Sequence, residues 1–192
     1  MKFLLLAILL VLSGCTSSIN KLTTPNAQVS KDKSDGSVYV RQPPVNASRD
    51  SFSSGDAWHT LGFEWLSRIP DTVFFTVGVI GQASQIQDLA LIADDQVIQG
   101  IKPTSDTNIN IDQSVGIPLK DTYRRYSMPL DEFRKVAAAR VVKMKIFRAH
   151  DTSSSQFGKD FPYVAVNGKF SPFLNKVDAL LANPLKADQL AQ

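Results

Sequence analysis

Three side chains of the kinds most often found at catalytic or metal centres stand out: Cys15, His59 and His150, the only cysteine and the two histidines. The histidines lie far apart along the chain, and neither occurs in a ligand spacing such as H-x-x-x-H. A zinc site would have to recruit scattered carboxylates, because no second cysteine is available. We therefore expect no metal ion and no cofactor, and we expect both histidines at the surface or at strand edges.

Serine, histidine and aspartate occur together where Ser153-Ser154-Ser155 follows His150 and Asp151. These are the residue types of a serine hydrolase, but a catalytic triad needs a fixed geometry that neighbouring residues of a flexible loop do not provide. The sequence also lacks the G-x-S-x-G, phosphate-loop and dinucleotide-binding patterns. The pair Asp94-Asp95 lacks the spacing of a calcium loop and is typical of a hairpin turn. We expect the protein not to be an enzyme.

Basic residues gather in two segments that could be neighbouring strands. One face of such strands could meet anionic lipid, an acidic glycan or an acidic protein. The alternative is a solvated face, because outward lysines are ordinary on an antiparallel sheet. The net charge favours this alternative, since removing the first fourteen residues takes away only Lys2 and leaves twenty basic against eighteen acidic residues. The candidate anionic-partner patch consists of Arg124, Arg125, Arg140, Lys143, Lys145 and Arg148.

Aromatic residues are dense near the middle of the first half. A platform for stacking on sugars is one interpretation, but at strand spacing such residues lie more often in the core. Trp58 is the exception, because it is out of phase with the alternating Leu61, Phe63 and Trp65. The aromatic residues concerned are Trp58, Phe63, Trp65, Phe74 and Phe75.

The first fifteen residues have the pattern of a secretory signal peptide. Lys2 precedes an unbroken apolar run from Phe3 to Leu12, and the small residues Ser13 and Gly14 follow. A basic start, a short apolar stretch and small residues before a cleavage site are the parts of such a peptide. The run is ten residues long, and a helix needs about 20 to cross a bilayer. Export also argues against nucleic acid as a partner.

Leu12-Ser13-Gly14-Cys15 resembles the lipobox of bacterial lipoproteins. The resemblance covers only residues 1–15. It implies that Cys15 receives a diacylglycerol, that cleavage removes residues 1–14, and that the new amino group is acylated as well. Thr16 stands where Asp is the usual inner-membrane retention signal, so the resemblance implies the outer membrane, facing the periplasm, in an organism with two membranes. The alternative is an ordinary signal peptide, or a buried free thiol at Cys15.

Composition divides the rest of the chain into three parts. Residues 15–36 comprise Cys15 and a polar stretch that we expect to be a disordered tether, because they contain too few apolar residues to offset the entropy of ordering. Residues 37–183 have the size of one domain with its own core. Residues 184–192 form a C-terminal tail.

Alternation of apolar and polar residues predicts most of the strands. Asp131 is expected to cap a helix over 132–139, and Ser171-Pro172 to begin a last helix that ends at Asn183-Pro184. Residues 102–118 read as a long loop with at most a short strand. The predicted fold is α+β and mainly β, an antiparallel β-sandwich-like domain with one or two covering helices. The strands are expected at 37–42, 59–66, 72–80, 85–93, 96–101, 123–128 and 140–148.

These features together predict a lipid-anchored cell-envelope module that binds or scaffolds a protein partner. Its attachment to the membrane would be through Cys15. The alternative function is a carrier or receptor for a lipid, a glycan or another small envelope molecule. A carrier would need an apolar or aromatic-lined cavity.

Overall fold

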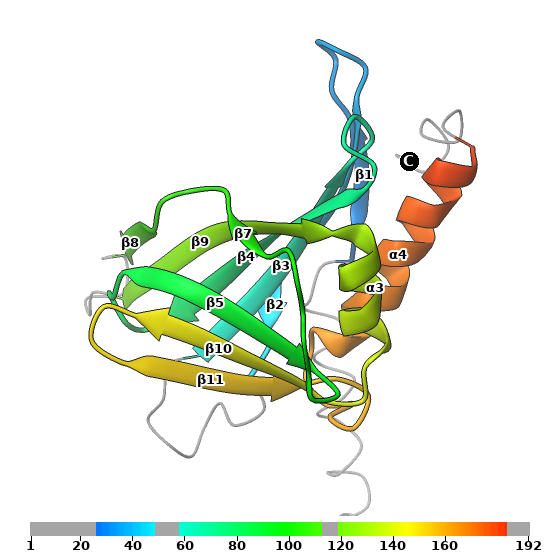
Figure 1. Cartoon of the computed structure of the whole chain (residues 1–192). Coiled ribbons are helices and arrows are strands. Elements are labelled where there is room, and N and C mark those ends of the chain that lie inside the picture. Colours follow the sequence, from blue (N-terminus) through cyan, green and yellow to red (C-terminus); the bar gives the residue numbers. More distant parts are fainter. Residues whose placement is uncertain (1–25, 49–57, 113–118, 184–192) are drawn as a thin grey trace, which may run out of the picture.

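The computed structural model describes residues 26–48, 58–112 and 119–183. These residues form two antiparallel sheets and two helices, which confirms the expected mainly-β, sandwich-like α+β fold (Figure 1). The helices are α3 (Leu130–Ala138) and α4 (Asn167–Ala182). Both helices have an apolar side that faces the sheets, so the molecule has one continuous core.

The larger sheet has the strand order β1-β2-β3-β4-β9-β7, with β8 also paired to β9. The smaller sheet has the order β11-β10-β5-β6. The strands of the larger sheet are β1 (Gln28–Lys31), β2 (Val38–Asn46), β3 (Trp58–Leu66), β4 (Thr72–Ile80), β7 (Lys102–Pro103), β8 (Asn108–Asp112) and β9 (Leu119–Pro129). Those of the smaller sheet are β5 (Ile86–Ala93), β6 (Gln96–Val97), β10 (Val142–Arg148) and β11 (Thr152–Phe157).

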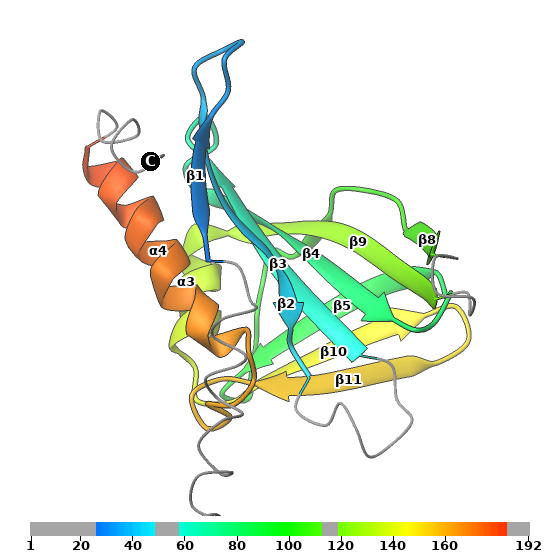
Figure 2. The same cartoon turned by 180° about the vertical axis from the view of Figure 1, so that it is seen from behind.

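One face of the larger sheet carries the core. The smaller sheet crosses this face at one end, and α3 and α4 lie at the other end (Figures 1 and 2). The ring of Phe63 on β3 packs against Phe133 of α3 at 5.0 Å between centroids and against Phe170 and Phe173 of α4 at 4.8 and 5.5 Å. Phe157 of β11 lies 6.0 Å from Phe170, so the aromatic cluster joins the helices to both sheets.

The opposite face of the larger sheet is not covered by either helix or by the smaller sheet (Figure 2). We call it the outer face. Side chains alternate across a strand, so every second residue of β2, β3, β4 and β9 points to this side. Phe74, Thr76 and Arg125, for example, are only partly buried, whereas Phe75 and Val77 are fully buried.

The prediction of a disordered tether over residues 15–36 is wrong from residue 26 onward, because residues 26–36 belong to the folded domain. Strand β1 pairs with β2, and both Ala27 and Val29 are buried. The Nζ of the buried Lys169 on α4 donates to Asn26 Oδ1 at 3.1 Å, and burial lowers the pKa of this lysine. Two apolar residues are too few to predict a strand by composition, but pairing with β2 satisfies the backbone and makes the strand stable.

Both helices begin earlier than predicted. Helix α3 starts at Leu130 after Pro129, and Asp131 lies in its first turn, where a negative charge suits the helix dipole, rather than capping it. Helix α4 starts at Asn167, so Pro172 lies inside it, and Ser171 does not cap it. The C-terminal limit is confirmed, because Asn183 is the C-cap.

Strand β11 is a second correction to the predicted elements. Its sequence TSSSQF was expected to be a flexible loop, yet all six of its residues pair with β10. Serine favours strands little. The pairing with β10 and the burial of Ser155 and Phe157 determine this strand, and neither is visible in a local pattern.

Candidate functional site

His59 lies in the interior, between the two sheets, and not at the surface or edge as expected. Only 2% of it is exposed. Its Nε2 lies 2.9 Å from Ser153 Oγ on β11, and its Nδ1 lies 3.3 Å from Ser48 Oγ, just after β2. The backbone N–H of His59 also donates to Ser48 Oγ at 2.9 Å. The imidazole therefore joins β3 of the larger sheet to the edge strand of the smaller sheet.

Serine hydroxyl groups lie beside both ring nitrogens of His59. One ring nitrogen of a neutral imidazole donates and the other accepts, and a serine hydroxyl can take either part. These bonds explain how a polar side chain is accommodated between the sheets, since burial without partners would cost about 1–3 kcal/mol. The structure thus brings Ser153 to His59, and not to His150 as the local run of residues suggested.

His150 lies in the turn between β10 and β11 and is exposed. No cluster of three or more histidine, cysteine, aspartate or glutamate side chains that could hold a metal ion occurs within residues 26–48, 58–112 and 119–183. Cys15 lies outside these described residues, as does its proposed lipidation.

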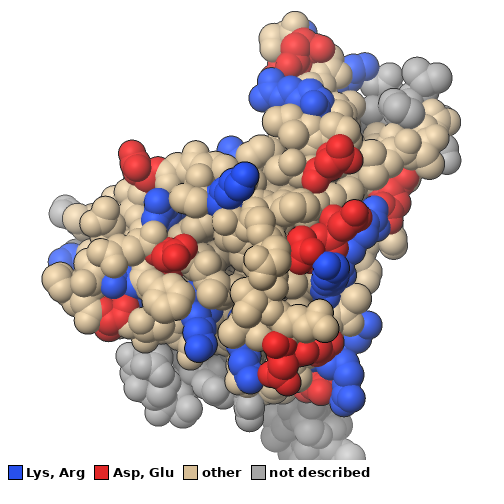
Figure 3. All heavy atoms as spheres, in the orientation of Figure 1, with Lys and Arg blue, Asp and Glu red and all other residues tan. Residues whose placement is uncertain are grey.

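The six basic residues of the predicted patch lie on different sheets. Arg124 and Arg125 belong to β9, whereas Lys143, Lys145 and Arg148 belong to β10, and Arg140 precedes it. The expectation that their segments are neighbouring strands is wrong, because β9 pairs with β4, β7 and β8, and β10 pairs with β5 and β11. Figure 3 shows basic and acidic side chains interspersed on the face it presents.

Most of these basic residues have structural partners. Arg124 closes the side of the sandwich opposite His59, because its Nη1 donates to the carbonyl of Ile86 at 2.8 Å and also reaches that of Gln87. Arg148 is buried and its Nη2 donates to Asp151 Oδ2 at 2.6 Å. The other ion pairs are Arg125 with Glu64, Arg140 with Asp160, and Lys143 with Asp95; Lys145 is exposed on β10.

Asp94 and Asp95 form the predicted hairpin turn between β5 and β6. Both have the left-handed backbone conformation, with φ of 46° and 64°. Asp94 Oδ1 accepts from the backbone N–H groups of Val141 at 2.9 Å and Arg140 at 3.0 Å. These hydrogen bonds lower the pKa of Asp94. The pair therefore acts as a turn and as an anchor for the start of β10.

The β1–β2 hairpin projects from the body of the molecule, beside the β3–β4 turn (Figure 1). Asp32 Oδ1 accepts from the backbone N–H of Ser34 at 2.8 Å, and Asp35 Oδ1 accepts from that of Ser37 at 2.8 Å. The hydroxyl groups of both serines donate to the same oxygens, and the four bonds lower the pKa of both aspartates. We call residues 31–37 and 67–71 the tip.

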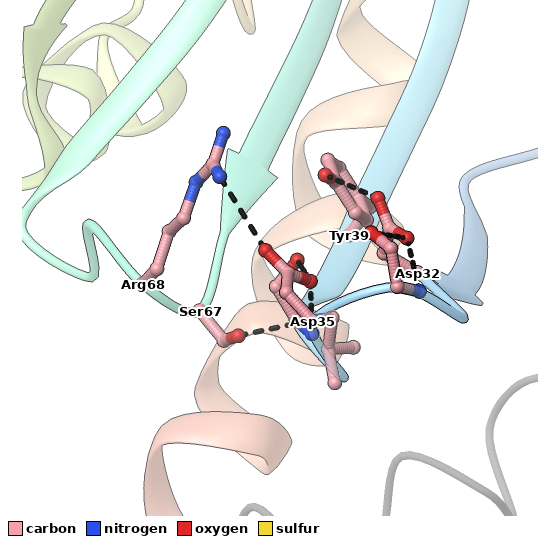
Figure 4. A network of polar contacts seen from close by, with 8 residues as sticks. Asp32, Asp35, Tyr39, Ser67 and Arg68 are labelled. Atoms are coloured by element: carbon pink, nitrogen blue, oxygen red, sulfur yellow. Dashed lines mark hydrogen bonds and ion pairs between the residues drawn. The ribbon is translucent and has the colours of Figure 1, made fainter.

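Further contacts connect the two loops of the tip (Figure 4). Arg68 Nη1 lies 3.5 Å from Asp35 Oδ2, and Ser67 Oγ accepts from the backbone N–H of Val38 at 2.9 Å. The hydroxyl of Tyr39 donates to Asp32 Oδ2 at 3.3 Å. The tip also exposes Ile69, 41% of which is accessible. It is thus a projecting surface whose loops are held by local hydrogen bonds.

The aromatic residues divide between the two faces of the larger sheet. Phe63, Trp65 and Phe75 are core residues with at most 2% exposed. Trp58 begins β3 on the outer face and is 42% exposed. Phe74 also lies on the outer face, where the guanidinium of Arg125 covers its ring at 4.6 Å from the centroid. The five residues therefore do not form one sugar-stacking platform.

Comparison with known proteins gives no family: no protein-family model matches the chain, and no curated protein matches its sequence. Neither of the two helices in the described part of the chain is long and apolar enough to span a bilayer.

Proposed function

We propose that this protein is a lipid-anchored module of the cell envelope that binds a protein partner without catalysing a reaction. The anchor would be Cys15 in the outer membrane, facing the periplasm. The observation that supports partner binding is the tip, a projecting pair of loops that combines charged groups with the exposed Ile69.

Local hydrogen bonding makes the tip suitable for docking. Association is weakened by the entropy lost when loops become ordered, and loops that are already ordered lose less. Asp32 and Asp35 each accept two hydrogen bonds within their own turn, so the conformation of the tip does not depend on a partner. An exposed isoleucine among polar groups resembles the apolar centre and polar rim of protein interfaces.

The alternative function, a carrier of a small molecule, has less support. Where the larger sheet meets the two helices, the core consists of packed rings, those of Phe63, Phe133, Phe170 and Phe173, at centroid separations of 4.8–5.6 Å. Ser153 and His59 are residue types of a hydrolase, but their hydrogen bond joins the two sheets, and we assign it a structural part.

The proposal can be tested by site-specific crosslinking in living cells. A photoreactive amino acid would replace Lys33 or Ile69 at the tip, and Lys145 on the smaller sheet would serve as the matched exposed control. We expect a discrete protein adduct from both tip positions and none from position 145. Equal adducts from all three positions, or none from the tip, would contradict docking at the tip.

A further inference from the structure

We infer that a hollow on the outer face receives a carboxylate side chain of the partner, so the partner presents an acidic segment to this face. The inference rests on the proposed function, which it extends by naming the chemistry of the partner. The hollow lies between β2, β3, β4 and β9, and its lining includes Arg41, Pro44, Glu64, Phe74, Thr76 and Arg125.

The size of the hollow fits a single functional group. Its volume is about 110 Å³, whereas sites for whole small molecules are typically about 300–1,000 Å³. Pro44 overlies Gly62, because a Cβ at position 62 would meet Pro44 N at 2.9 Å. The register of β2 and β3 shifts between Gln42 and Val45, so Pro44 departs from regular pairing and lines the hollow.

Among the charged side chains that line the hollow, the guanidinium of Arg41 has no ion-pair partner within the described residues. Arg125 donates to Glu64, and its guanidinium also stacks on Phe74, so both Arg125 and Glu64 are held in place. Arg41 lies opposite Glu64 in the register of β2 and β3. Within the described residues its guanidinium makes no ion pair, since Glu64 is engaged with Arg125. Two guanidinium groups against one carboxylate give the lining a net positive charge, which favours an anion.

Tyr39 lies between the hollow and the tip. Tyr39 lies two residues before Arg41 on the same face of β2, and its hydroxyl donates to Asp32 at the tip. A partner that contacts Ile69 and the charged groups of the tip would therefore extend along the outer face to Arg41. The small volume and the position of the hollow on the same strand as the tip both favour a side chain of the docked protein over a separate small ligand.

The test follows the Nε–H signals of Arg41 and Arg125 by NMR in the full chain in detergent. The probe is the blocked tripeptide Gly-Glu-Gly, and Gly-Gln-Gly is its uncharged control. We expect saturable shifts with the glutamate peptide alone. In Arg41→Gln, affinity should fall by about tenfold or more, because a hydrogen bond to a charged group is lost. Lys145→Gln should leave it unchanged.

The inference would be overturned by no shift with the glutamate peptide, by equal shifts with the glutamine peptide, or by full affinity in Arg41→Gln. Equal affinity for free acetate would also overturn it, because the hollow would then bind any carboxylate and not a peptide.

Crosslinking separates this inference from the proposed function. If Arg41→Gln leaves the adducts from Lys33 undiminished, the hollow is excluded and docking stands; if the tip gives no adduct, docking itself fails.

Discussion

At the scale of single residues, His59 and Arg124 connect the two sheets on opposite sides of the sandwich. His59 does so through serine hydroxyls, and Arg124 does so through backbone carbonyls of β5. In each case a polar side chain on the larger sheet forms hydrogen bonds to the smaller sheet, and such bonds help to determine how the sheets are positioned.

The link through His59 can be measured by a double-mutant cycle. We expect His59→Ala to lower the free energy of unfolding by about 2–3 kcal/mol, because it removes buried volume and the hydrogen bonds to Ser48 and Ser153. Ser153→Ala should cost about 1 kcal/mol, and the coupling energy should be about 1 kcal/mol. The measurement is urea denaturation, with the exposed Ser154→Ala as the matched control. A coupling energy of zero would show that the bond contributes nothing.

Each carboxylate of the tip is held mainly by the serine of its own turn. Their pKa values are lowered in the fold, so the charged forms stabilise the tip above the usual range of aspartate, and this contribution is lost as the pH falls through the lowered values. We expect Ser34→Ala to raise the pKa of Asp32 and leave that of Asp35 low, and Ser37→Ala to do the reverse. Carboxyl NMR titration measures both, and equal changes at both aspartates would contradict separate turns.

The burial of His59 was predictable from phase alone. It lies two residues before Leu61 and in phase with Phe63 and Trp65, so it shares their core side of β3. Its partner Ser153 could not be predicted, because the contact joins residues on different sheets. The same holds for Arg41 and Arg125, whose proximity depends on the strand order of the larger sheet.

At the scale of elements, backbone geometry limits the connection after β11. Gly158 has φ of 116°, and a Cβ there would lie 2.5 Å from the carbonyl oxygen of Arg140. An L-residue is strained in this conformation, and the contact with backbone cannot be relieved by a rotamer change. The position thus requires glycine.

We expect Gly158→Ala to lower the free energy of unfolding by at least about 2 kcal/mol. The matched control is Gly168→Ala in α4, where a Cβ meets nothing within 4 Å, so stability should rise by about 0.5–1 kcal/mol through helix propensity. Thermal unfolding of both variants measures the difference. Equal stability of the two would contradict the strain at Gly158.

The strands in which apolar and polar residues alternate most regularly could be predicted from the sequence. Strand β4 has its predicted bounds, because it lies at the centre of a sheet and is rich in β-branched and aromatic residues. Strands β1 and β11 are edge strands with polar sequences, and their pairing partners determine them. The start of α4 was not predicted correctly because Ser171-Pro172 has the pattern of a helix start, five residues after the actual one.

At the scale of the whole molecule, the membrane anchor is the prediction with the simplest test. We expect Cys15→Ser to abolish incorporation of labelled palmitate and to remove the mature protein from the membrane fraction, because no other cysteine can accept the lipid. Ser13→Ala, which keeps a small residue before the cleavage site, should remain acylated. A Cys15→Ser protein that is still labelled would contradict the resemblance to lipoproteins.

The direction of β1 places the start of the described chain and the tip at opposite ends of the strand. The described part of the chain begins at Asn26, and β1 runs from there toward the tip, so Asn26 and the tip lie at opposite ends of this strand (Figures 1 and 2). If Cys15 carries the lipid, the eleven residues from there to Asn26 span at most about 40 Å. Each residue added between Cys15 and Asn26 would allow the tip to lie up to about 3.6 Å farther from the bilayer. The length of this segment would therefore determine how far from the membrane the protein can bind its partner.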